Sequence, residues 1–150
     1  MNNASFIDNS SYALDPRLAK EAIAEHQLPI SQILLRNEQC FPWLIMVPRQ
    51  ANLLEIFDLS EDHQALFWKE MTEVSDVLKD VTQADKINIA AFGNMVSQLH
   101  VHIIARHKTD PLWPENVVGA KQADAYRDHQ PPDWWSSFLE RLARKDLNKP

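Results

Sequence analysis

The sequence predicts an α+β fold built on an antiparallel sheet. Short apolar segments with the length of strands lie close together along the chain. One long segment between them has helical periodicity, and another helical segment lies near the C-terminus. Short connections between neighbouring strands permit only antiparallel pairing. With 150 residues, the chain is long enough for one domain with its own hydrophobic core.

The N-terminal part begins with residues 1–14, a polar stretch that we expect to be flexible. Asp15 is a good helix cap and Pro16 fits the first turn of a helix. A short helix is therefore predicted from Asp15 to His26, and Pro29 ends it.

Four segments are predicted to be strands. Residues 30–36 and 43–47 are apolar and are separated by turn residues, which indicates a hairpin. Residues 86–91 form a third strand. Residues 98–106 form a longer fourth strand, after a break at Gly93.

The longest predicted helix extends from Ser60 to about Val81. Ser60 is a suitable N-cap, and the acidic residues directly after it favour the positive end of the helix dipole. The apolar residues of this segment follow helical spacing: Phe67, Met71, Val74, Leu78 and Val81. A last helix follows Pro132, within residues 111–150, a C-terminal extension that we expect to pack on the domain formed by residues 15–110.

Charge and composition argue against several classes of function. The net charge is -6, whereas general nucleic-acid binders usually carry a basic face. A small anion can still bind in a local positive pocket. The single cysteine, Cys40, cannot form an internal disulfide, no signal peptide is recognised, and no apolar run has the length of a membrane span. We therefore expect a cytoplasmic protein that contacts neither membrane nor nucleic acid.

The segment from Gln98 to Arg106 carries the candidate chemistry. Side chains alternate between the two faces of a strand, so Gln98, His100 and His102 share one face. The opposite face is apolar and suits a core: Leu99, Val101, Ile103 and Ala105. Alternate residues lie about 6.5–7 Å apart, so two imidazoles could reach one phosphate group. One could attack phosphorus while the other donates a proton to the leaving oxygen.

Two other interpretations of the histidine pair remain open. A His-x-His pair in a strand is often part of a polar surface without chemistry. Such a pair can also begin a metal site, since imidazoles suit zinc, iron or copper. Asp110 is a candidate third ligand, although the single cysteine leaves no thiolate cluster.

The segment from Gly93 to Ile104 resembles the signature of the histidine-triad (HIT) superfamily. That signature is His-φ-His-φ-His-φ-φ, where φ is apolar, after a short loop that contains glycine. His100 and His102 stand at the second and third histidine positions, and Gln98 stands at the first. The chain is similar to a bacterial HIT subgroup of hydrolases.

The resemblance extends beyond the signature. Asn37 and the stretch from Trp43 to Pro48 look like the upstream hairpin of the family, and the helix from Ser60 looks like its long helix. The resemblance covers about residues 15–110. It implies a HIT-like fold, with an antiparallel sheet of about five strands, one long helix and shorter flanking helices. It also implies a homodimer formed by joined sheets and packed long helices.

The resemblance implies a nucleotide substrate, usually a purine nucleotide, with no required cofactor and with metal binding left open. His100 would attack the α-phosphorus and form a nucleotidyl-histidine intermediate, and His102 would contact the phosphate and assist the leaving group. Dinucleoside polyphosphates and nucleoside phosphoramidates are the leading substrates. The chain would then be a hydrolase similar to diadenosine tetraphosphate hydrolases.

Further residues are expected to bind the substrate. By resemblance, Asn94 would lie in the loop that contacts phosphate, with Gly93 and Ser97 beside it, and Asn37 would lie near the ribose. Gly93 could let backbone N–H groups approach phosphate oxygens. Arg106 has the same strand parity as the histidines and could pair with phosphate.

Gln98 and Met95 depart from the family pattern. A glutamine amide can hydrogen-bond a phosphate but carries no titrating proton, and a thioether cannot donate a proton. We still expect activity, because the nucleophile and its neighbouring histidine are present. The alternative is a nucleotide-binding sensor with weak or no turnover.

Overall fold

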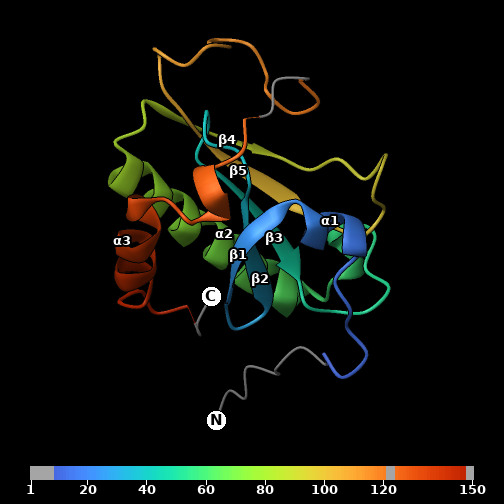
Figure 1. Cartoon of the computed structure of the whole chain (residues 1–150). Coiled ribbons are helices and arrows are strands. Elements are labelled where there is room, and N and C mark those ends of the chain that lie inside the picture. Colours follow the sequence, from blue (N-terminus) through green and yellow to red (C-terminus); the bar gives the residue numbers. More distant parts are fainter. Residues whose placement is uncertain (1–8, 121–123, 148–150) are drawn as a thin grey trace.

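The computed structural model describes residues 9–120 and 124–147. Within them the chain forms a five-stranded antiparallel sheet in the order β1-β2-β3-β5-β4, with helices on both faces (Figure 1). The predicted antiparallel α+β architecture is confirmed. The strands are β1 (Ala22–Gln27), β2 (Ser31–Arg36), β3 (Trp43–Pro48), β4 (Lys86–Ala90) and β5 (Val101–Arg106). The α-helices are α1 (Pro16–Lys20), α2 (Glu61–Thr82) and α3 (Asp133–Leu142).

The N-terminal helix is shorter than predicted. Asp15 caps it as expected, since its side chain accepts a hydrogen bond from the backbone N–H of Arg17. The helix ends at Lys20, however, and residues 22–27 form the edge strand β1, so the predicted extension to His26 is wrong. Pairing with β2 supplies the backbone hydrogen bonds of this segment, and this tertiary contact outweighs its local helical pattern.

The remaining elements lie close to their predicted bounds. The side chain of Ser60 caps α2 by accepting a hydrogen bond from the backbone N–H of His63, and the helix ends where Gln83 adopts a left-handed conformation. The fourth predicted strand begins later than expected, at Val101. Its first three residues, 98–100, approach the sheet without joining the regular ladder.

The two faces of the sheet are covered differently, and this positions the site. The helices α2 and α3 lie together on one face, where the larger core cluster forms (Figure 1). Leu99, Val101 and Ile103 point into that cluster. The other face carries a smaller cluster, to which α1 contributes Leu18 and β5 contributes Ile104. None of the helices among the described residues is long and apolar enough to cross a membrane.

Candidate active site

Two imidazole rings lie together on the face of the sheet that α2 and α3 do not cover. His102 is in β5 and His100 directly precedes that strand, so the apolar residues between and after them enter the helix-side core. The ring centroids are 5.1 Å apart and the rings are nearly perpendicular. The two residues are only 6% and 8% exposed. Strand alternation therefore brings both rings to one place.

The hydrogen bond of His100 fixes which of its nitrogens carries the proton. The Nδ1 atom lies 2.7 Å from the backbone carbonyl oxygen of Gln98. A carbonyl oxygen can only accept, so Nδ1 is the donor and holds the proton. In the neutral ring, Nε2 then keeps its lone pair. His100 is thus oriented as a nucleophile through Nε2.

His102 has the opposite arrangement. The indole Nε1–H of Trp43 donates to Nδ1 of His102 over 3.0 Å. An indole N–H can only donate, so Nδ1 of His102 is an acceptor and the proton of the neutral ring lies on Nε2. The site therefore pairs one imidazole with a free Nε2 lone pair and one with an Nε2–H donor.

The surroundings of His102 oppose its protonation. Burial, and after it the nearby charges of His100 and Arg36, lower the pKa of His102 to about 4. The guanidinium carbon of Arg36 lies 4.0 Å from the ring centre of Trp43, in a cation–π contact, and Arg36 also pairs with Glu21 over 3.1 Å. His102 is consequently neutral near pH 7.

The side chain of Gln98, expected at the catalytic face, is engaged elsewhere. Its Oε1 accepts from the backbone N–H of Asp15 and its Nε2 donates to the carbonyl oxygen of Ala13, both over 2.9 Å. Both halves of the amide are therefore used to hold the N-terminal segment against the start of β5. The contribution of Gln98 to the site is its backbone carbonyl, which orients His100.

Arg106 is buried in an ion pair. It is 1% exposed, and its Nε and Nη2 atoms donate to the two carboxylate oxygens of Asp110 over 2.7 and 2.9 Å. Its Nη1 atom donates to the side chain of Asn88 and to the carbonyl oxygen of Glu115. All three nitrogens of the guanidinium have protein partners, and the contact between Arg106 and phosphate stays a prediction.

Asn37 is covered by the C-terminal part of the chain. Its Oδ1 accepts from the backbone N–H of Tyr126, and its Nδ2 lies 3.0 Å from Nδ1 of His129. The side-chain amide that was expected beside a ribose thus connects the end of β2 to residues 126–129. Both polar atoms of the Asn37 side chain therefore have partners in the C-terminal part of the chain.

The loop before His100, unlike Asn37, is exposed to solvent. Gly93, Asn94 and Ser97 are exposed, and a Cβ atom added at Gly93 would meet nothing within 4 Å. Gly93 also lacks a positive φ, so the loop backbone does not require glycine there. The loop is tied to α1 by Arg17, whose Nη1 donates to the carbonyl oxygen of Met95 over 2.7 Å.

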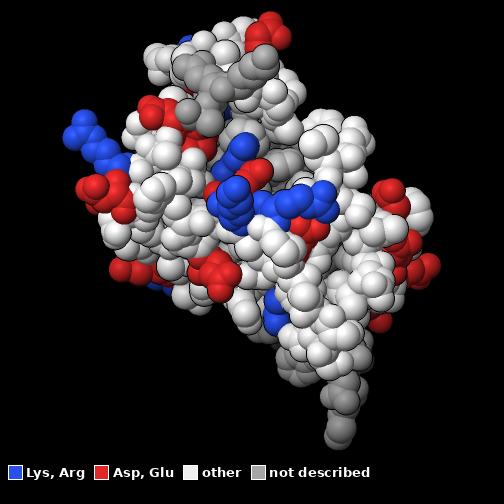
Figure 2. Space-filling model, turned by 45° about the vertical axis from the view of Figure 1, so that its right-hand side comes forward, with Lys and Arg blue, Asp and Glu red and all other residues white. Residues whose placement is uncertain are grey.

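Charged side chains gather around α1. Figure 2 brings this side of the molecule forward and shows basic side chains near the centre of the view, with acidic ones beside them and around the rim. Around α1, Arg17 pairs with Asp15, and Arg36 pairs with Glu21. Paired basic and acidic side chains therefore lie around α1, on a chain whose net charge is -6.

Trp43 and Arg36 were not recognised from sequence as partners of the histidines. From the sequence, Trp43 is expected to lie in the core or to stack on a base, and Arg36 is expected to form a surface salt bridge or to contact a phosphate. The position of Trp43 depends on the register in which it faces Ile104, because this pairing places the indole beside His102. No local pattern indicates that register.

Within the part of the chain that the structure describes, no third ligand lies with the histidine pair. Asp110, the candidate ligand, pairs with Arg106 instead. Among residues 9–120 and 124–147, no three His, Cys, Asp or Glu side chains form a group that could hold a metal ion.

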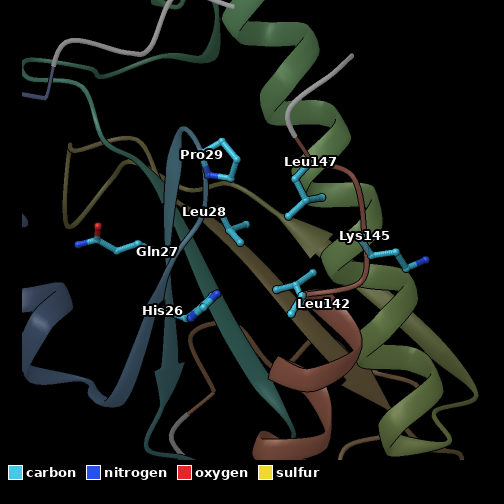
Figure 3. A pocket seen from close by; sticks show the side chains of 8 residues that line it. His26, Gln27, Leu28, Pro29, Leu142, Lys145 and Leu147 are labelled. Atoms are coloured by element: carbon cyan, nitrogen blue, oxygen red, sulfur yellow. The ribbon is translucent and has the colours of Figure 1, made fainter.

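A separate pocket lies on the helix side of the sheet, between the β1–β2 connection and the end of α3. Leu28, Leu142 and Leu147 converge in it, while the ends of Gln27 and Lys145 point away (Figure 3). Lys145 already forms ion pairs with acidic residues of α2. The pocket has a mixed polar and apolar lining and lies on the other side of the sheet from His100 and His102, so we assign no chemistry to it.

The comparisons with known proteins agree on one family. Residues 21–109 match the HIT domain family. A histidine triad protein from Bradyrhizobium japonicum is 42% identical, with a TM-score of 0.79 over 89% of this chain and 97% of that one. A histidine triad protein from Sinorhizobium meliloti is 39% identical, with a TM-score of 0.77 over 89% and 96%. A third, from Marinobacter aquaeolei, is 34% identical, with a TM-score of 0.75 over 87% and 93%. No curated protein matches the chain.

Proposed function

This chain belongs to the HIT domain family, and we propose that it acts on nucleotides at the α-phosphorus, as a hydrolase or a nucleotidyl transferase. One observation carries the proposal. The Gln98 carbonyl holds the proton of His100 on Nδ1, so a nucleophilic Nε2 lies beside a second imidazole that presents an Nε2–H.

The proposed reaction has two displacements. Nε2 of His100 forms a bond to the α-phosphorus while the bond from phosphorus to the leaving group breaks, and the leaving group departs with the electron pair. Water, or another acceptor, then forms a bond to phosphorus. The N–P bond breaks, its electron pair returns to Nε2, and the proton of the acceptor passes to solvent. In both displacements Nε2–H of His102 can stabilise charge on a phosphate oxygen.

The proposed contacts to phosphate come from the exposed loop. Gly93, Asn94 and Ser97 lie there, directly before His100, and no protein side chain fills the space at Gly93. Asn37 and Arg106 are not included, because their side-chain polar groups are bonded to other parts of the chain. The leading substrates are dinucleoside polyphosphates and nucleoside phosphoramidates.

A trapped intermediate tests this function. The chain is mixed with a nucleotide radiolabelled at the α-phosphorus and quenched with detergent, and the adduct is examined for acid lability, which is typical of phosphoramidates. We expect label on the wild-type chain and none on His100→Ala. The matched control is His26→Ala, which removes a histidine from the helix side of the sheet and should retain the label. Absence of both adduct and turnover across a panel of nucleotides would contradict the proposal.

A second candidate function is a nucleotide sensor. It is favoured by the engagement of the Gln98 amide with the N-terminal backbone and by the exposed thioether of Met95, since neither side chain offers a proton to a leaving group. Nucleotide binding measured by calorimetry, without turnover and without an adduct, is the result expected for a sensor.

A further inference from the structure

We propose that Trp43 is a positioning residue that holds His102 as a neutral hydrogen-bond donor, and that the site consequently prefers nucleotides with a phosphoanhydride leaving group over phosphoramidates. The substrate part of this inference rests on the function proposed above. The part that concerns the two side chains rests on their geometry alone.

The contact between the rings permits one protonation state. Trp43 is 2% exposed, and its Nε1–H points at Nδ1 of His102 over 3.0 Å. If His102 became an imidazolium, Nδ1 would carry a hydrogen that faces the indole hydrogen. The contact would then be repulsive, and the indole N–H would be buried without an acceptor. Protonation of His102 therefore requires this contact to break.

The charged groups around His102 act in the same direction. From β2, Arg36 stacks on Trp43, and beside β5 lies His100. From β3 and β4, the cross-strand neighbours Ile45 and Ala90 bring no charge. The acidic groups near α1 are already paired with arginines, Asp15 with Arg17 and Glu21 with Arg36. No unpaired carboxylate among the described contacts of His102 favours its cationic form.

A neutral His102 with its proton on Nε2 is a hydrogen-bond donor but a poor acid. Loss of that proton would leave an imidazolate, which is far too basic to form near neutral pH. His102 can thus stabilise a phosphate oxygen in the transition state without transferring a proton to the leaving group. The other nearby groups do not replace it, because the proton of His100 is held by the Gln98 carbonyl and the Gln98 amide is bonded to Ala13 and Asp15.

This difference separates the two classes of substrate. In a phosphoanhydride, the P–O bond breaks and the leaving phosphate keeps the electron pair as an anion, which is stable near neutral pH because the second pKa of a phosphate is about 6. In a phosphoramidate of an alkyl amine, the P–N bond breaks only if the nitrogen receives a proton, since an amide anion is too basic to leave. General acid catalysis typically contributes about 100-fold or more. A site in which neither imidazole can give up its proton should lose that factor on phosphoramidates only.

NMR of the full chain with 15N-labelled histidine and tryptophan tests the tautomer without any turnover. We expect Nδ1 of His102 to be unprotonated, Nε2 to be protonated, and this state to persist from about pH 8 to about pH 5. We also expect a scalar coupling across the hydrogen bond between the Trp43 indole and Nδ1. A proton on Nδ1 of His102 in this range would overturn the inference, whatever the enzyme activity.

The Trp43→Phe variant tests whether the indole N–H of Trp43 fixes the tautomer of His102. It removes the indole N–H but keeps an aromatic ring, so we expect His102 to show mixed tautomers and to take up a proton at higher pH than in the wild type. Trp68→Phe, which changes a tryptophan that is 61% exposed, should leave His102 unchanged. If His102 in folded Trp43→Phe still carries its proton on Nε2 alone, as in the wild type, the proposed role of Trp43 is overturned. If this variant does not fold, the role of Trp43 is decided by the scalar coupling between its indole and Nδ1 of His102 in the wild type. Absence of that coupling would overturn the role.

Kinetics test the substrate preference. We expect the ratio of kcat/KM for diadenosine tetraphosphate to that for an adenosine phosphoramidate of an alkyl amine to be on the order of 100 or more in the wild type. The ratio should fall in Trp43→Phe as His102 becomes able to supply a proton, and remain unchanged in Trp68→Phe. A wild type that prefers the phosphoramidate would overturn the substrate part. Failure on both substrates, together with absence of the His100 adduct, would contradict the proposed function, while the NMR result would still decide the role of Trp43.

Discussion

At the scale of single residues, burial and a fixed partner determine what each imidazole can do. His102 is 8% exposed and accepts its hydrogen bond from an indole, whereas His100 is 6% exposed and donates to a carbonyl oxygen. Identical side chains thus have opposite proton positions because their Nδ1 atoms meet opposite partners. An imidazole in water takes up a proton below about pH 6.5, whereas buried His102 stays neutral there. The free energy of unfolding must therefore depend on pH.

The stability of the fold should decrease with acidity because of His102. Its pKa is about 4 in the folded protein and about 6.5 in an unfolded chain, so only the unfolded chain takes up this proton between these values. The stabilising contribution is complete above about pH 6.5 and is lost as the pH falls toward 4. The free energy of unfolding should fall by up to about 3 kcal/mol over this range.

Urea unfolding at several pH values measures this effect. His102→Gln should lose that part of the pH dependence, whereas His63→Gln, at the start of α2, should retain it. An identical pH dependence in wild type and His102→Gln would show that His102 is not kept neutral by the fold.

At the scale of elements, the N-terminal segment is held against the histidine face by side chains from distant parts of the chain. Gln98 bonds the backbone of Ala13 and Asp15, and Tyr12 donates its hydroxyl to Oε1 of Gln32 on β2 over 3.1 Å. The amide of Gln98 supplies one donor and one acceptor at once. An apolar side chain of similar size could supply neither.

Gln98→Leu should release this segment. Two hydrogen bonds are lost and the affected groups are partly exposed, so we expect a cost of about 1–2 kcal/mol in the free energy of unfolding. Hydrogen exchange of the Asp15 amide should become faster. The Leu99 amide, which donates to the carbonyl oxygen of Leu53, provides an internal reference. Unchanged exchange at Asp15 would mean that Gln98 does not hold the segment.

At the scale of the whole molecule, the sheet ends in an edge strand that carries apolar surface. Among the described strands, the order leaves one side of β4 without a partner strand. Ile89 on this strand is 46% exposed. We propose that two copies of the chain join here into the expected homodimer, with β4 edges paired and α2 helices packed, because this would pair the free edge and bury Ile89.

A change of mass in solution tests the dimer. Ile89→Lys places a charge in the proposed contact and should convert a dimer into a monomer, as measured by light scattering during size-exclusion chromatography. Gln27→Lys, on the opposite edge strand β1, should leave the dimer intact. A monomeric wild type would contradict this arrangement.

The features that could be predicted from the amino-acid order depend on local chain geometry. Alternation along a strand places the side chains of His100 and His102 together and sends Val101 and Ile103 into the core, and a suitable cap and helical spacing fixed α2 within one residue at each end. These features depend on residues that are neighbours in the chain.

Which atoms meet across the fold could be known only from the three-dimensional arrangement. The partners of Gln98 and Arg106, the indole beside His102, and the strand β1 in place of a longer helix all depend on strand register and on segments far apart in sequence. The physical reason is that a polar side chain has many possible partners in an unfolded chain, and packing selects one of them. The proton positions on the two imidazoles follow from that selection.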